Sequence, residues 1–162
     1  MLQVFKPFPT VRQTCRAAAL PDATRAFARD TITLGWVERL KVRARRRSDG
    51  GVEFGTVLDR GTMLREGDCL ILDEPPTVIT VVAQQEAVFV IAPRTAADWG
   101  RFAYQIGNSH QPLMLTDTAI VCPDVLGMEQ VLTYHGIPFS RASCAFTPIG
   151  HAGEIAEHRH QP

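Results

Sequence analysis

Long apolar runs, an excess of charge of either sign and paired cysteine motifs are all missing from this chain of 162 residues. Because no stretch of about 18 apolar residues occurs, we expect no transmembrane helix and no membrane partner. Seventeen Lys and Arg residues balance seventeen Asp and Glu residues. This balance argues against a nucleic-acid partner, since proteins that bind a phosphate backbone are usually basic.

The cysteines are few and scattered, at Cys15, Cys69, Cys122 and Cys144. They show no CxxC spacing, which argues against a zinc ribbon or a thioredoxin-like motif. The first twenty residues also lack the apolar segment behind a basic start that marks a secretory signal. We therefore expect a cytoplasmic protein with reduced thiols, and we expect Cys69 and Cys144 to be buried in strands.

Sequence signatures of common enzyme classes are absent as well. The chain contains no GxSxG, GxxxxGK[ST], HExxH or GxGxxG pattern, which mark nucleophile elbows, phosphate loops, zinc proteases and dinucleotide sites. No pair of carboxylates is placed for general acid and base work. We expect no catalytic residue and no organic cofactor, and hence a protein that is not an enzyme.

The first half of the chain has the pattern of short strands. Prolines interrupt residues 1–30, which remain an unassigned leader, and a period of two begins at about Thr31. Residues 40–45 alternate apolar and basic side chains, and residues 48–51 (Ser-Asp-Gly-Gly) are typical of a turn. Several short strands at close spacing predict a small all-β N-terminal domain over residues 1–84, a sandwich or barrel.

Helices and strands alternate in the second half. Residues 87–91 predict a strand, and Thr95 predicts the start of a helix that ends at a Gly107 cap. Further strands follow at about 113–115, 119–122 and 139–146, with a second helix from Asp124 to Gly136. The order β-α-β-β-α-β predicts a ferredoxin-like domain over residues 85–149. The fold class is therefore α+β.

The last segment, residues 150–162, contains almost no core-forming residues, and we expect a flexible tail. It carries three of the five histidines, His151, His158 and His160. Neutral imidazole is a good ligand for nickel, copper and zinc, so the tail is a candidate metal-binding segment. A solvated polar tail with chance histidines, or a cloning remnant, is the alternative.

Two further histidines and one basic cluster are the remaining candidates for a functional role. His110 follows the predicted first helix in the run Gly-Asn-Ser-His-Gln-Pro, either as an ordinary loop histidine or as a ligand that meets its own copy across a two-fold axis. His135 is interpreted as packed at the edge of the core. The basic cluster over residues 43–47 is interpreted as the solvated face of a strand, with an acidic protein partner left open.

From Thr31 to Pro148 the chain resembles the UreE family of urease accessory proteins, the nickel metallochaperones of urease maturation. The resemblance rests on RGTxLxxGD at residues 60–68 and AYxIGNxHxP at residues 103–112, in this order. It is supported by the arginine run at 43–47, by residues 54–59 and by Phe-Thr-Pro at 146–148.

This resemblance implies a peptide-binding-like first domain and a ferredoxin-like second domain that forms a homodimer. It also implies that His110 meets its two-fold mate to bind Ni(II), and that His151, His158 and His160 supply further ligands. The implied function is delivery of Ni(II) to urease during assembly of its metallocentre. The implied partners are the urease apoprotein and its accessory complex, including the maturation GTPase.

Three alternatives remain. Imidazole ligands also accept Zn(II) or Cu(II) in vitro, so the residues alone do not select nickel. A metal-independent adaptor that bridges urease maturation factors would use the first domain instead. A small hydrolase with a metal-bound water would need a carboxylate partner beside His110, and the sequence shows none.

Overall fold

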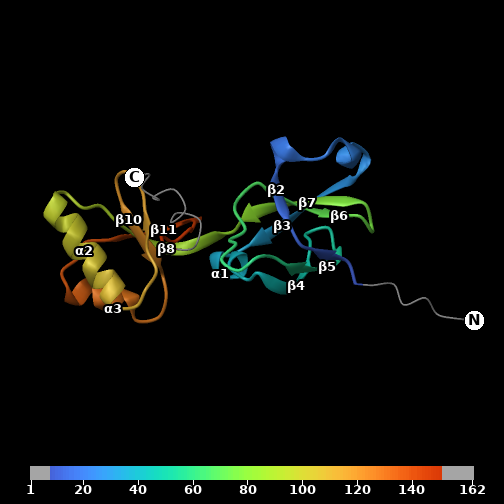
Figure 1. Cartoon of the computed structure of the whole chain (residues 1–162). Helices are drawn as coiled ribbons and strands as arrows, with labels where there is room; N and C mark the ends of the chain where they lie inside the picture. Colours follow the sequence, from blue (N-terminus) through green and yellow to red (C-terminus); the bar gives the residue numbers. More distant parts are fainter. Residues whose placement is uncertain (1–7, 151–162) are drawn as a thin grey trace, which may run out of the picture. The chain divides into compact units, whose positions relative to one another are not determined.

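The computed structural model of the chain describes residues 8–150, and residues 1–7 and 151–162 are not described. The described residues form two compact units, divided between Ala83 and Gln84 (Figure 1). The tail expected over residues 150–162 therefore lies outside the described residues, except for Gly150. No helix among residues 8–150 is long and apolar enough to cross a membrane.

The first unit is a sandwich of two small sheets. One sheet has the strand order β1-β5-β4 and the other has the order β2-β6-β7-β3. The β1–β5 and β3–β7 pairs are parallel, and the other neighbours are antiparallel. The elements are β1 (Thr10–Val11), β2 (Thr14–Arg16), η1 (Ala17–Ala19), η2 (Asp22–Ala26), β3 (Ala28–Leu34), α1 (Trp36–Arg39), β4 (Arg43–Arg47), β5 (Glu53–Val57), β6 (Asp68–Leu72) and β7 (Thr77–Ala83).

Alternate residues of these strands meet between the two sheets. Leu70 and Leu72 of β6 lie in one core cluster with Phe54 of β5 and Val11 of β1. Each is almost fully removed from water, and such burial stabilises the fold by about 1.5–3 kcal/mol for each large side chain. The period of two in the sequence predicts this all-β unit, and the structure confirms it.

The unassigned leader contains structure from residue 8 onward. Strands β1 and β2 pair with β5 and β6 respectively, and β3 begins at Ala28, three residues before the expected start at Thr31. Strands of two and three residues are too short to show a period. Their partners are supplied by strands more than 40 residues away, so only tertiary pairing reveals them.

The basic cluster is only partly solvated, because Arg46 is buried with 6% of its side chain exposed. Its Nη2 donates to the carbonyl oxygens of Glu38 at 3.1 Å and Lys41 at 2.8 Å, and its Nε donates to Thr56 Oγ1 at 3.1 Å. Arg46 thus satisfies carbonyls at the end of α1. The strand expected from Leu40 begins only at β4, because α1 and its cap occupy the preceding residues.

The predicted turn at residues 48–51 joins β4 to β5 and is held against the edge strand β3. Asp49 accepts hydrogen bonds from Thr31 Oγ1 at 2.7 Å and Thr33 Oγ1 at 3.0 Å. Asp30 accepts from the Gly50 N–H at 3.0 Å, and a Cβ at Gly50 would lie 2.6 Å from Asp30 Oδ2. These two carboxylates cover part of the free edge of β3, which would otherwise expose unpaired backbone groups.

The second unit has the βαββαβ order, and its four strands form one antiparallel sheet in the order β11-β8-β10-β9. This is the predicted ferredoxin-like arrangement. The helices α2 and α3 bury Phe102, Ile106 and Leu132 in a core cluster with Phe89 of β8. The elements are β8 (Gln85–Ile91), α2 (Ala96–Asn108), β9 (Met114–Leu115), β10 (Ile120–Pro123), α3 (Met128–Tyr134) and β11 (Ser140–Ala145).

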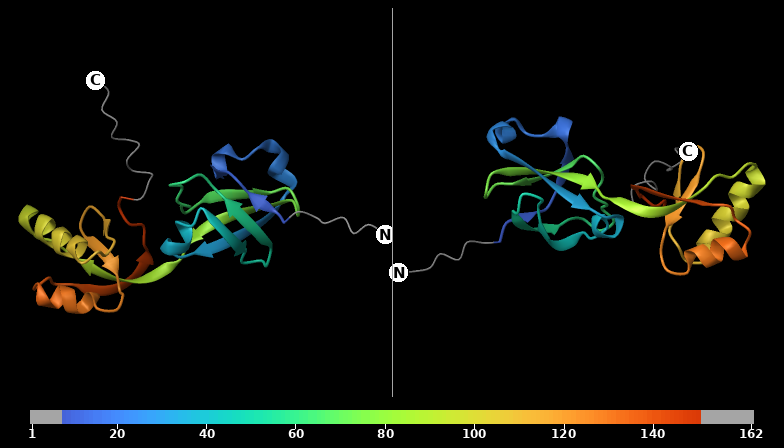
Figure 2. Two further views of the ribbon diagram at one scale, coloured as in Figure 1. Left: turned by 60° about the horizontal axis from the view of Figure 1, so that its bottom comes forward. Right: turned by 180° about the vertical axis from the view of Figure 1, so that it is seen from behind.

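The second helix is shorter than its pattern predicts. It was expected from Asp124, but residues 125–128 form a turn in which the Met128 N–H donates to the Val125 carbonyl at 3.0 Å. Gly127 has φ 88°, a left-handed conformation that precedes the helix and interrupts any earlier start. Figure 2 shows the two helices lying against the sheet of this unit.

The carboxylates that hold the turn make the first unit sensitive to acid. Hydrogen bonds from Ser48 to Asp30 and from Thr31 to Asp49 are the main causes that hold both carboxyl pKa values below their usual range. A group with a lowered folded pKa stabilises the fold above its unfolded pKa of about 3.9. That stability is lost as the pH falls through the folded pKa.

We predict that the Asp30→Asn/Asp49→Asn variant loses less unfolding free energy than the wild type when the pH is lowered below about 4. Urea unfolding at a series of pH values measures this slope. Asp73→Asn removes an exposed carboxylate outside the turn and should leave the wild-type slope unchanged. Equal slopes in the double variant and the wild type would contradict the assignment.

Candidate metal centre

The candidate site lies at the carboxyl end of helix α2. A capping hydrogen bond and buried side chains hold this helix in place. Thr95 Oγ1 accepts the Asp98 N–H at 3.1 Å and caps the first turn, as its spacing predicts. Phe102 and Ile106 fix the inner face of the helix in the core of the second unit. The carboxyl end of α2, and the residue that follows it, are thereby held at a defined place on this unit.

The helix ends at Asn108, is capped by Ser109 and is closed by His110, and not by the expected Gly107 cap. The His110 N–H donates to the Gly107 carbonyl at 2.9 Å, and the Gln111 N–H donates to the Ile106 carbonyl at 3.4 Å. This pair of bonds is a Schellman closure, whose left-handed residue is His110 with φ 55°. Gly107 lies within the helix, so its role as a cap is wrong.

A histidine in this backbone conformation is unfavourable. The left-handed position of a Schellman closure is usually glycine, and a side chain there costs about 1–2 kcal/mol. Among residues 8–150, His110 is the one residue other than glycine with a positive φ. Strained residues of this kind concentrate at functional sites. The exposed imidazole at this position is therefore a candidate ligand.

The outer face of α2 is open in the described residues. Gly100, Tyr104 and Gly107 are spaced by four and three residues and so share one side of the helix. A Cβ at Gly100 or at Gly107 would meet no atom within 4 Å, and Tyr104 is 66% exposed. This face, which we call the α2 outer face, leads directly to His110.

The described part of the chain forms no complete metal site around His110. Residues 8–150 contain no group of three or more His, Cys, Asp or Glu side chains that could hold a metal ion. His135 is half-buried at the end of α3, where its ring packs edge-on against Tyr134 at 4.9 Å between centroids. The predicted ligands His151, His158 and His160 lie outside the described residues.

The last described residues, which follow β11, lie beside the residues that come shortly after His110 in the sequence. Phe146 is fully buried, and the Thr147 N–H donates to the Met114 sulfur at 3.3 Å. The Ile149 N–H then donates to the Leu113 carbonyl at 2.8 Å. The chain after β11 is thus hydrogen-bonded beside residues that lie three and four positions after His110. The Phe-Thr-Pro run at 146–148 supports the family resemblance in the sequence, but the hydrogen bonds of this segment to residues 113 and 114 were not predicted.

The thiols are poor candidates for ligands in the second unit. Burial raises the pKa of Cys122 to about 12, so this thiol stays protonated at neutral pH. Cys144 is only partly buried, which corrects the expectation of full burial, because β11 is an edge strand. Cys69 is buried as expected.

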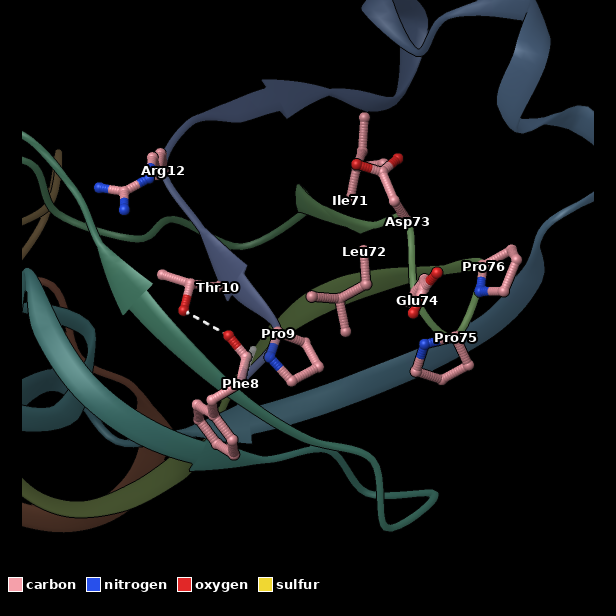
Figure 3. Close-up of a pocket in the computed structure, with 10 residues that line it drawn as sticks. All are labelled: Phe8, Pro9, Thr10, Arg12, Ile71, Leu72, Asp73, Glu74, Pro75 and Pro76. Atoms are coloured by element: carbon pink, nitrogen blue, oxygen red, sulfur yellow. Dashed lines mark hydrogen bonds between the residues drawn. The ribbon is translucent and has the colours of Figure 1, made fainter. Parts of the chain in front are cut away.

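A separate pocket of about 1050 Å³ lies in the first unit. Figure 3 shows its two walls, one formed by Phe8, Pro9, Thr10 and Arg12 and the other by residues 71–76. Among its described lining residues, the carboxylates of Asp73 and Glu74 are the potential metal ligands, and the wall also carries Arg12. This lining suits an organic or peptide segment better than a metal ion.

Comparison with known proteins matches both units. Residues 13–84 match the family described as UreE urease accessory protein, N-terminal domain, and residues 86–162 match its C-terminal domain. A urease accessory protein UreE of Burkholderia thailandensis is 35% identical over 127 residues, which are 78% of this chain and 59% of that protein.

Two further relatives carry the same name. A UreE of Burkholderia mallei is 33% identical over 126 residues, covering 78% of this chain and 62% of the relative. A UreE of Burkholderia pseudomallei shows the same identity and the same coverage. The chain thus spans about three fifths of the length of the curated relatives it matches.

The backbone strain at His110 gives a prediction. Relative to His110→Ala, the His110→Gly variant should raise the free energy of unfolding by about 1 kcal/mol, because glycine adopts a positive φ without a Cβ clash. Urea unfolding in the presence of a chelator, at one protein concentration, measures the difference. His135, whose φ is −87°, is the control position for the same two substitutions. His135→Gly should be no more stable than His135→Ala, and a similar gain at both sites would rule out strain at His110.

Proposed function

The chain belongs to the UreE family of urease accessory proteins, and we propose that it is a nickel-binding metallochaperone that delivers Ni(II) to urease. The ion would be cargo, held during assembly of the urease metallocentre and then released. The proposal includes a cytoplasmic location and no catalytic activity. Its partners would be the urease apoprotein and its accessory complex, including the maturation GTPase.

The observation that carries this proposal is the exposed His110 in left-handed backbone at the end of a rigid helix. Imidazole nitrogen is a preferred ligand for nickel, and it binds Zn(II) or Cu(II) as well. A ligand on a well-packed element keeps a fixed position, and its exposure leaves the ion accessible to exchange. Both properties suit a carrier that must give up its ion.

The course of the chain supports a contribution from the tail histidines. His151 follows Ile149 by two positions, so at most about 7 Å of chain lies between them. Ile149 is in turn hydrogen-bonded to Leu113, three residues after His110. The covalent path therefore starts the histidine-containing segment near the candidate ligand. His151, His158 and His160 remain the proposed further ligands.

A homodimer would complete the centre. One imidazole holds a divalent ion poorly, but a two-fold axis beside His110 supplies two copies of the same ligand. The α2 outer face supports such a contact, because Gly100 and Gly107 allow a close approach of another backbone and Tyr104 offers exposed aromatic area. We propose that this face lies at the dimer interface.

The first unit favours a second candidate function, a metal-independent adaptor that bridges urease maturation factors. The pocket between Phe8–Arg12 and residues 71–76 is the observation in its favour, since it offers apolar and charged groups to a protein segment. Binding experiments can distinguish an adaptor from a carrier. An adaptor binds its partners in metal-free buffer and is indifferent to the loss of His110.

Calorimetric titration with nickel tests the carrier proposal. We predict tight binding near one nickel per dimer, which disappears in His110→Ala because both copies of the central ligand are lost. A chain that ends at Gly150 should bind at least ~10-fold more weakly, by loss of the tail ligands. His135→Ala serves as the matched control and should bind as the wild type does.

The outcomes of these titrations distinguish the carrier from the adaptor. Wild-type affinity in His110→Ala would contradict the central site, and loss of binding only on truncation would then assign the metal to the tail. If the wild type binds no nickel, the carrier proposal fails. Partner capture in metal-free buffer by a His110→Ala chain would then support the adaptor.

The dimer is tested with a charge on the α2 outer face. We predict that Gly107→Arg converts the dimer to a monomer at micromolar concentration, because a buried unpaired guanidinium at a two-fold contact faces its own copy. Light scattering coupled to size exclusion measures the mass. Tyr134→Arg alters an 85%-exposed residue on the other helix and should leave the mass unchanged. A dimeric Gly107→Arg protein would place the interface elsewhere.

A further inference from the structure

Two of the four cysteines lie directly opposite each other on neighbouring strands of the first unit. Cys15 of β2 and Cys69 of β6 are register partners in an antiparallel pair. Residues in this relation project to the same face of the sheet. They are 54 positions apart in the sequence, so only the sheet brings them together.

The geometry of this pair suits a disulfide. Directly opposed residues of antiparallel strands have Cα atoms about 4.5–5.5 Å apart, and disulfide-bonded residues span about 4.4–6.8 Å between Cα atoms. The pKa of Cys15 is raised, first by burial and then by the charge of the neighbouring Cys69. Only a small fraction of Cys15 is therefore thiolate at neutral pH, and its attack on a disulfide is slow. Both thiols are free in this structure.

The two thiols also differ in access. Cys69 is 2% exposed on a central strand, whereas Cys15 is partly exposed on β2, a three-residue edge strand. We propose that Cys15 and Cys69 form a redox-responsive dithiol in which Cys15 reacts first and Cys69 closes the disulfide.

The reaction balances with a small-molecule disulfide, such as oxidised glutathione, as the oxidant. The Cys15 thiolate attacks one glutathione sulfur, forms a mixed disulfide and releases one glutathione thiolate. The Cys69 thiolate then attacks the Cys15 sulfur and releases the second. The protein loses two protons and two electrons, and one glutathione disulfide becomes two thiols.

The disulfide would join the two walls of the pocket in the first unit. Cys15 follows Arg12 of one wall by three residues, and Cys69 precedes Ile71 of the other wall by two (Figure 3). In the reduced chain, β2 is held to β6 by backbone pairing and by an Arg16–Asp68 ion pair at 3.3 Å. Oxidation would add a covalent tie and fix the spacing of the walls. This inference does not depend on nickel binding.

The test treats the reduced full chain with oxidised glutathione in chelator-containing buffer. We expect the thiol count after denaturation to fall from four to two, and mass spectrometry to find one peptide pair, joined through Cys15 and Cys69. Hydrogen exchange of residues 10–16 should slow in the oxidised chain and return to its original rate after reduction. A chain oxidised in urea should instead show mixed pairings.

Single variants separate the two roles. Cys69→Ser should keep one glutathione on Cys15, whereas Cys15→Ser should form no internal bond. A Cys122→Ser/Cys144→Ser chain is the matched control and should oxidise as the wild type does. The proposal is overturned if the native wild type retains four thiols, if another pair is joined, or if exchange of residues 10–16 does not respond to the bond.

Discussion

Two backbone hydrogen bonds close helix α2 around His110, and the geometry of the candidate centre depends on them. The bonds from His110 and Gln111 to the carbonyls of Gly107 and Ile106 hold the histidine in left-handed backbone. Ile106 is also part of the core, so the closure is tied to the packing of α2 against the sheet. The imidazole consequently projects from a rigid support, and the backbone strain at His110 is held in place by that packing.

The end of the second unit complements this arrangement. Burial of Phe146 anchors the chain after β11, and hydrogen bonds from Thr147 and Ile149 to residues 113 and 114 set its direction. The histidine-containing segment therefore starts from a fixed point on the same unit that carries His110. A fixed ligand together with ligands on a separate segment would allow stepwise release, because each imidazole can be exchanged in turn.

The first unit offers a different chemistry. Its two small sheets bring the chain's first strands against strands far along the sequence, which creates both the pocket and the Cys15–Cys69 pair. Polar anchors, one buried and two nearer the surface, keep these short elements in place. Arg46 binds carbonyls at the end of α1, and Asp30 and Asp49 hold the turn of the β4–β5 hairpin. The unit thus combines a pocket with a directly opposed pair of cysteines.

The resemblance to the UreE family singled out His110 as the central candidate, and the sequence by itself determined the α+β class, the β-rich first half and the βαββαβ order. Local signals are sufficient for these, since strand and helix periods and turn residues act over a few positions. Only the tertiary structure decided the left-handed conformation of His110, the pairing of β1 and β2, the burial of Arg46, the return of Ile149 to Leu113 and the opposition of Cys15 and Cys69. Each of these depends on contacts between distant residues or on which of several possible helix ends packs best, and no local pattern encodes such contacts.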